Sequence, residues 1–150
     1  MNNSEADALA IALVDERKAD TIADRLREGL ARFNDPKVGP RRSRPLVISL
    51  TDEHGQLVGG LVGRTYWNAL HIELLWISED HRHGGFGRRL VEAAEDEGRA
   101  RGAEVVYLTT LSFQAPEFYE RLGYSRLAEL MDVPKGASRL WYSKRLANAV

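Results

Sequence analysis

A cluster of three glycines between an apolar segment and a helical segment restricts the fold of this 150-residue chain more than any other feature. Leu70–Ile77 has the composition of a buried strand, and the chain from about Gly87 to Arg101 has apolar residues at helical spacing. A glycine-rich turn that opens into a helix presents backbone N–H groups and the positive end of the helix dipole, which suits it to holding phosphate. The alternative is a tight turn that needs glycine for its geometry alone.

Composition excludes several classes of protein. With 43% hydrophobic and 29% charged residues, the chain suits one globular domain over 1–150 and is short for two. A net charge of −1 argues against nucleic-acid binding as the main function. No cysteine is present, so thiol nucleophiles and cysteine metal sites are excluded. His81 and His83 lack a third ligand at convincing spacing, so we expect no metal site.

The chain shows no sign of export or membrane insertion. The apolar stretch Ala8–Val14 follows acidic residues rather than basic ones, which is unlike a secretion signal. No apolar run approaches the roughly 18 residues that a membrane span needs. We therefore expect a cytoplasmic protein with no membrane partner.

Turn residues and periodicity predict an α/β (α+β) domain in which helices pack on a mixed sheet. A first helix is expected from Asp20 or Thr21 until Asn34–Pro36, followed by an exposed arginine-rich loop at Lys37–Pro45. Shorter helical patterns are Gly87–Arg101, with exposed ion pairs, and Ala115–Leu122, closed by Gly123. The predicted strands are Leu9–Leu13, Pro45–Thr51, Gln56–Thr65, Leu70–Ile77, Glu104–Thr110, Tyr124–Leu130 and Ser138–Arg145.

Two details of the predicted strands bear on the site. Gly59 and Gly60 indicate a bulge or a close backbone approach. In the strand Leu70–Ile77, simple alternation places Ile72, Leu74 and Trp76 on one face, but a bulge, which is expected in this strand, can reverse that parity.

The glycine turn does not match the common nucleotide motifs. Leu90 replaces the third glycine of a dinucleotide fingerprint, and no Lys-Ser/Thr pair follows for a P-loop. The pattern that fits is Arg82-x-x-Gly85-x-Gly87, which resembles the acyl-CoA pyrophosphate loop of the GNAT N-acetyltransferase superfamily. A second block, Phe118–Tyr124, is similar to the downstream helix of that family, which carries an aromatic pair and ends in Gly-aromatic.

The resemblance covers nearly the whole chain and implies a fold and a cofactor. The expected sheet has six to seven mostly antiparallel strands, whose central pair, Leu70–Ile77 and Glu104–Thr110, splays to admit the pantetheine arm of acetyl-CoA. Residues implied in cofactor binding are Leu75, Trp76, Ile77, Arg82, His83, Gly84, Gly85, Phe86, Gly87 and Arg88. His83 departs from the family pattern, in which glycine often follows the loop arginine.

The resemblance also implies direct attack of an amine on acetyl-CoA, which agrees with the absence of cysteine. Tyr119 matches the family tyrosine that hydrogen-bonds the departing sulfur, although it could instead be a packed aromatic residue. The base is Glu73 or His71, which share one side of the strand, or ordered water. Both side chains could also be ordinary polar groups of a strand.

The function expected is acetylation of a small-molecule or peptide amine, and the alternative is a non-catalytic acyl-CoA sensor with the same fold. The cluster Arg41, Arg42 and Arg44 is typical of a solvated loop, but it could also meet the ribose phosphate of CoA or an acidic acceptor. Family members often dimerise, which makes a homodimer an expectation here.

Overall fold

The computed structural model describes residues 9–147. Contacts divide the chain between Pro40 and Arg41 into two units, and each unit is described by itself.

The N-terminal unit contains one long helix. Residues 9–15 form no regular secondary structure, so the prediction of a strand at Leu9–Leu13 is wrong. Alternating apolar residues form a strand only when a neighbouring strand accepts their hydrogen bonds. Asp15 caps the 3₁₀ turn η1 (Glu16–Lys18) by accepting from the Arg17 N–H at 2.9 Å.

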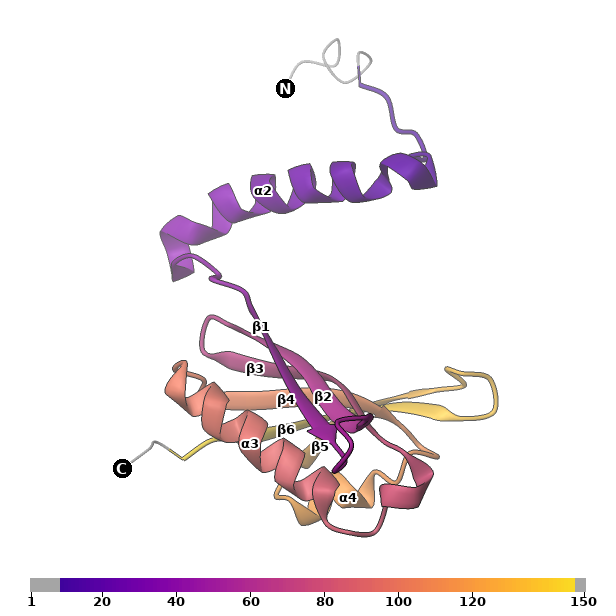
Figure 1. The fold of residues 1–150 in the computed structure, drawn as a ribbon. Helices are drawn as coiled ribbons and strands as arrows, with labels where there is room; N and C mark the ends of the chain where they lie inside the picture. Colours follow the sequence, from indigo (N-terminus) through magenta and orange to yellow (C-terminus); the bar gives the residue numbers. More distant parts are fainter. Residues whose placement is uncertain (1–8, 148–150) are drawn as a thin grey trace. The chain divides into compact units, whose positions relative to one another are not determined.

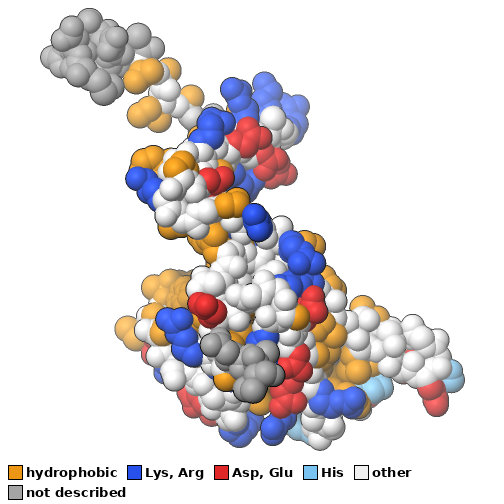
Figure 2. All heavy atoms as spheres, turned by 90° about the vertical axis from the view of Figure 1, so that its left-hand side faces the viewer, with side chains coloured by type: hydrophobic (Ala, Val, Ile, Leu, Met, Phe, Trp, Pro, Cys, Tyr) orange, Lys and Arg blue, Asp and Glu red, His pale blue; other side chains and the backbone are white. Residues whose placement is uncertain are grey.

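The helix α2 (Ala19–Val38) continues through Pro36, where the sequence predicted its end. Proline this near a helix end removes one internal hydrogen bond without stopping the backbone. The helix ends instead before Gly39, whose φ of 80° and ψ of 166° form a backbone conformation that is open almost only to glycine. None of its residues is buried, and hydrophobic side chains stand at the surface of this unit beside charged ones (Figure 2).

The C-terminal unit is a six-stranded mixed sheet crossed on one face by the helix α3 (Figure 1). The strand order is β1-β2-β3-β4-β6-β5, and only the β3–β4 pair is parallel. The predicted mixed, mostly antiparallel sheet is thereby confirmed. Its elements are β1 (Arg44–Thr51), β2 (Leu57–Tyr66), β3 (Ala69–Ile77), η2 (Glu79–His81), α3 (Phe86–Ala100), β4 (Val105–Leu111), α4 (Glu117–Arg121), β5 (Ser125–Met131) and β6 (Ser138–Arg145).

Paired glycines allow β2 to lie very close to both of its neighbours. A Cβ atom on Gly59 would stand 2.8 Å from the Trp76 carbonyl oxygen, and one on Gly60 would stand 2.6 Å from the Ile48 oxygen. Any side chain there would displace backbone, which confirms the predicted close approach.

A β-bulge at Glu73 reverses the faces of β3. Val62 pairs with Leu74 while Gly63 pairs with Ile72, so Glu73 is the extra residue. Ile72 is 2% exposed but Leu74 is 53% exposed, because alternation restarts after the bulge. The prediction that these two residues share a face is therefore wrong.

The two central strands separate partway along their length. β3 and β4 pair from Ala69↔Val105 to Ile72↔Leu108 and no further. β3 continues to Ile77 and β4 to Leu111, so both strands have an edge without a partner strand beyond this point. This is the splay that the family resemblance implied.

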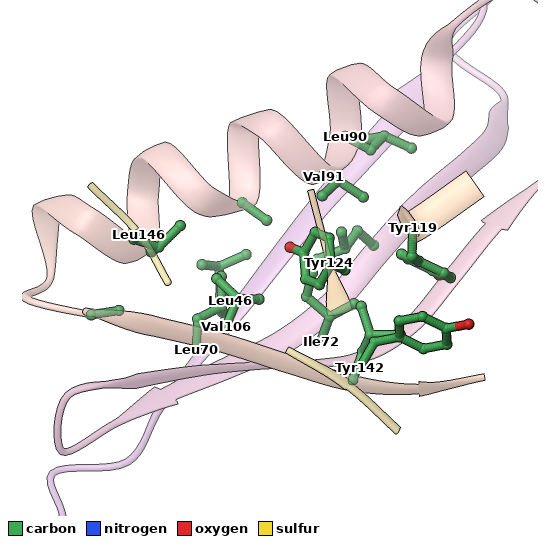
Figure 3. Packing of buried hydrophobic residues seen from close by; sticks show 14 of the residues in the cluster. Leu46, Leu70, Ile72, Leu90, Val91, Val106, Tyr119, Tyr124, Tyr142 and Leu146 are labelled. Atoms are coloured by element: carbon green, nitrogen blue, oxygen red, sulfur yellow. The ribbon is translucent and has the colours of Figure 1, made fainter. Parts of the chain in front are cut away.

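The hydrophobic core lies between α3 and the sheet (Figure 3). The face of the sheet that meets α3 is called the inner face, and the opposite face is called the outer face. Val91, Ala94, Leu70 and Val106 in this core are fully buried. Figure 3 shows Tyr119 toward the Leu90 end of the cluster and Leu146 at the other end.

The predicted ion pairs of α3 form, but one of them is not exposed. Arg88 bonds Glu92 at 2.7 Å and Arg101 bonds Glu97 at 2.6 Å. Glu95, which is 3.7 Å from Arg99, is only 3% exposed. The i,i+4 spacing predicts the partner, but burial depends on what packs against the helix.

Within residues 9–147, no helix is long and apolar enough to cross a bilayer. In the same residues, no three histidine or carboxylate side chains are grouped so that they could hold a metal ion.

Candidate active site

The glycine-rich turn begins where β3 ends and leads into α3. The Ser78 N–H donates to the Val58 carbonyl at 2.8 Å, and the Ser78 hydroxyl lies 2.8 Å from His81 Nδ1. Arg82 Nε donates to the Ile77 carbonyl at 3.0 Å. These bonds anchor the first half of the turn to the sheet, and the Arg82 side chain braces the loop.

The second half of the turn has unused hydrogen-bond donors. Among residues 9–147, no acceptor takes the backbone N–H groups from His83 to Arg88, and the first helical bond of α3 is from Arg89 to Gly85 at 3.2 Å. Gly85 has φ 77°, and a Cβ there would meet no atom within 4 Å. Consecutive free N–H groups at the start of a helix are an arrangement that favours anions in proteins.

His83 follows the loop arginine, Arg82, at a position where many family members have glycine. Its backbone has a conformation that glycine favours. Its φ is 64°, in the left-handed region, which is unfavourable for a residue with a Cβ atom. The loop therefore keeps the shape suited to glycine at that position and stores backbone strain.

Gly87 connects the loop to α4. A Cβ atom on Gly87 would lie 3.2 Å from Phe118 Cζ, which is tighter than ordinary contact. Glycine at 87 thus allows the start of α3 to rest on the Phe118 ring, next to Tyr119.

Tyr119 lies in the core on the inner face. It is 8% exposed, with its ring 5.9 Å from the Tyr124 ring and 6.3 Å from the Tyr142 ring. Burial raises the pKa of the Tyr119 phenol to about 12, so the hydroxyl stays protonated near neutrality. No hydrogen bond from this hydroxyl to another of residues 9–147 is present, which leaves its proton available to a bound group.

Glu73 lies on the outer face, on the bulge itself. Its carboxylate accepts a 2.8 Å hydrogen bond from Arg64 Nε, and Arg64 also donates to the Ser43 hydroxyl at 2.8 Å. Arg64 alternates with the buried residues Gly63 and Thr65, which places this pair on the face away from α3. Sequence reasoning missed Arg64, because its register partner is His71 and its hydrogen bond to Glu73 depends on the hairpin register and the bulge.

His71 is on the outer face as well, but its ring is already engaged. It stacks on Tyr107 with centroids 4.4 Å apart and planes 5° from parallel. Burial lowers the pKa of His71 despite the nearby Glu73 charge, so the neutral ring predominates at pH 7. The Tyr107 hydroxyl in turn bonds the Tyr66 hydroxyl.

The remaining residues predicted to bind the cofactor line the splayed half of β3. Leu75 and Ile77 turn inward and pack against the core, while Trp76 is 47% exposed on the outer face. The edge of β3 toward β4 is unpaired from Glu73 to Ile77 in the described chain, so these backbone groups can meet a ligand between the strands.

The arginine cluster lies at the other end of the sheet. Arg41 stands over the Tyr66 ring at 4.3 Å, and Arg44 pairs with Thr65, at the end where β3 begins. Eight residues of β3 separate that end from Ile77 and the loop, a span on the order of 25 Å. This position does not favour a contact between Arg41 and a phosphate bound at the loop.

The splayed β3–β4 pair beside a loop of free N–H groups is the arrangement that the resemblance to the GNAT superfamily implied for a class of acyl-CoA-dependent transferases. The model of the Acetyltransferase (GNAT) family matches residues 10–124. The chain belongs to this family, and it is an acetyl-CoA-dependent N-acetyltransferase.

Individual relatives agree with this assignment. The chain is 42% identical over 98 residues to a blasticidin-S acetyltransferase of Streptomyces morookaense, covering 63% of this chain and 72% of that protein. It is 33% identical over 128 residues to an acetyltransferase of Agrobacterium fabrum, covering 85% and 93%. A crystal structure of an acetyltransferase from Bacillus cereus superposes with a TM-score of 0.82 at 29% identity, covering 93% of this chain and 99% of that chain.

Proposed function

We propose that the chain transfers the acetyl group directly from acetyl-CoA to an acceptor amine. The amine enters from the outer face of the sheet, and the thiol leaves toward the inner face. The amine nitrogen of the acceptor approaches Glu73 from the outer face and attacks the thioester carbonyl carbon of acetyl-CoA in the splay. Glu73 takes the amine proton and later releases it to water, and an N–H of the unpaired segment 73–77 stabilises the oxyanion. The C–S bond breaks, and Tyr119 on the inner face donates a hydrogen bond and a proton to the departing sulfur, then recovers a proton from water.

One observation carries this proposal. The β3–β4 ladder stops at Ile72↔Leu108, next to a bulge that holds Glu73, while the protonated hydroxyl of Tyr119 belongs to the core on the inner face and has no hydrogen-bond partner among residues 9–147. Base and acid candidates on opposite faces suit a reaction in which the amine enters from one side and the thiol leaves toward the other.

The loop is proposed to hold the cofactor by its backbone. The free N–H groups from His83 to Arg88 would bind the pyrophosphate, and their position supports this because the positive end of the α3 dipole adds to their effect. Arg82 would act by bracing the loop rather than by direct contact. No metal is part of the proposal.

The reaction is tested by acetyl-CoA binding and by CoA release. Thermal shifts are measured with acetyl-CoA, CoA and ATP, and CoA release is then followed over a panel of amines that includes blasticidin S, polyamines, amino acids and peptide N-termini. Stabilisation by acetyl-CoA together with turnover on at least one amine is the expected result. Stabilisation by ATP alone would contradict the cofactor, and binding without turnover across the panel would favour the sensor alternative.

The role of Tyr119 is tested by Tyr119→Phe. The phenyl ring keeps its packing on Tyr124 and Tyr142, so acetyl-CoA affinity should stay within about twofold while kcat falls about 100-fold, the usual contribution of one general acid. An unchanged kcat would remove Tyr119 from the mechanism.

Three expectations remain predictions: a single domain over 1–150, a homodimer, and a cytoplasmic location. The acceptor is proposed to be a small-molecule or peptide amine, and the panel above decides between these two.

A further inference from the structure

A buried carboxylate on α3, hydrogen-bonded to the turn after α4, takes part in no step of the proposed mechanism. Glu95, in the middle of α3, is 3% exposed. Its oxygens accept from Lys144 Nζ at 3.0 Å each, and Oε1 also accepts from the Tyr124 hydroxyl at 2.9 Å. Three elements, α3, β6 and the turn after α4, therefore meet at one charge.

Placing this charge in the core has an energetic cost. Desolvation of a buried ion pair often cancels its Coulombic gain, so apolar residues of similar size would hold the same elements together at least as well. Stability alone thus gives little reason for Glu95. A charge-assisted hydrogen bond has a defined geometry, which apolar packing lacks. The Glu95 carboxylate therefore fixes the position of the Tyr124 hydroxyl relative to α3.

The hydrogen bond of the Tyr124 hydroxyl helps to hold α4 in place, because so short a helix has few contacts of its own. α4 has five residues, Glu117–Arg121, and no side chain caps its N-terminus. The Tyr124 N–H donates to the Tyr119 carbonyl at 3.0 Å, and the two rings lie 5.9 Å apart, edge to face. Movement of Tyr124 would therefore move the backbone and the ring of Tyr119 together.

The second anchor of this network comes from β6. Lys144 reaches Glu95 beneath Gly123, where a Cβ atom would stand 3.6 Å from Lys144 Cε. Gly123 has φ 91°, so the turn from α4 to Tyr124 is tight and passes directly over the lysine stem. The turn is thus held from α3 and from β6 at once.

We infer that Glu95 is a positioning residue for acetyl transfer: through Tyr124 it fixes where Tyr119 presents its hydroxyl to the departing sulfur. This inference rests on the role proposed for Tyr119. It also predicts that removing the Glu95 charge or the Tyr124 hydroxyl acts on kcat through Tyr119 and leaves cofactor binding at the loop unchanged.

A double-mutant cycle tests the inference. Glu95→Gln and Tyr124→Phe are made singly and each in the Tyr119→Phe background, and kcat and KM for acetyl-CoA are measured in the full-length protein. Each single variant should lower kcat about tenfold with KM within about twofold, because a small displacement of a reacting group costs this much or more. In the Tyr119→Phe background, neither change should lower kcat further by more than about twofold.

Glu97→Gln is the matched control. Glu97 also lies on α3 and bonds an arginine, Arg101, at 2.6 Å, but it is half exposed and has no bond to the turn after α4. It should leave kcat unchanged. Tyr124→Phe keeps the ring and all charges, so it tests the inference even where Glu95→Gln fails to fold.

The outcomes separate this inference from the proposed function. Losses in kcat that add fully to that of Tyr119→Phe, or single variants with unchanged kcat, would overturn the positioning role and leave the proposed function intact. If Tyr119→Phe itself has an unchanged kcat, the proposed role of Tyr119 fails and this inference fails with it.

Discussion

Arg64 Nε donates a 2.8 Å hydrogen bond to Glu73 Oε1, from the strand next to the bulge on which Glu73 lies. The bond joins the residue proposed as the base to a cation on β2, and the Ser43 hydroxyl holds that cation from its other side. The Glu73 carboxylate is thereby oriented on the outer face, at the point where β3 and β4 separate.

Glu73→Gln should lower kcat about 100-fold, because glutamine keeps the hydrogen bond to Arg64 but cannot accept the amine proton. KM for acetyl-CoA should remain within about twofold. The measurement is steady-state CoA release at saturating acceptor, once the amine panel has yielded one.

His71→Phe is the companion variant, and it separates the two candidate bases. Phenylalanine preserves the stack on Tyr107, which has 4.4 Å between ring centroids. If Glu73 is the base, this variant retains most of kcat. A large loss for His71→Phe with an active Glu73→Gln would assign the base to His71 instead.

Gly85→Val should weaken acetyl-CoA binding at least tenfold, because φ 77° is unfavourable for a β-branched residue and the N–H groups of the loop would turn away. Isothermal titration gives the affinity. Gly102→Val is the control, since Gly102 has φ 91° and an equally open Cβ position but lies after α3, outside the loop. Equal losses of affinity in both variants would show a general folding defect rather than a cofactor site.

His83→Gly should stabilise the fold by about 1 kcal/mol, since glycine adopts the observed φ of 64° without the Cβ penalty. Urea unfolding at pH 7 measures the difference. Because the free loop N–H groups belong to the backbone, acetyl-CoA affinity should change little. A clear loss of stability would show that the imidazole contributes more than its backbone strain costs.

Alkaline pH should destabilise the protein in part through Tyr119. Its folded pKa of about 12 exceeds the unfolded value of about 10, so its contribution to stability is complete below pH 10 and is lost as pH rises toward 12. Between pH 9 and 11 the free energy of unfolding should fall by about 1 kcal/mol more in the wild type than in Tyr119→Phe, which cannot ionise. Parallel pH profiles for the two proteins would contradict the buried, protonated phenol.

Much of this protein follows from its local sequence. The glycine turn after an apolar strand, the helix that follows it, and Gly123 closing α4 depend on backbone preferences and periodicity, which act over a few residues. The order of the elements from β1 to β6 and the glycine-rich turn before α3 could therefore be predicted from the sequence.

Tertiary structure decided the features that need a partner distant in the chain. The segment 9–15 has the alternation of a strand and yet forms none, because a strand requires a neighbour to accept its hydrogen bonds. The bulge at Glu73 arises from the register of β3 against β2, and it moves Leu74 to the outer face. Glu95 has the spacing of a surface ion pair, but Tyr124 and Lys144 bury it. Local sequence sets which conformations each segment prefers, whereas register and burial depend on which segments meet, and only the folded chain decides that.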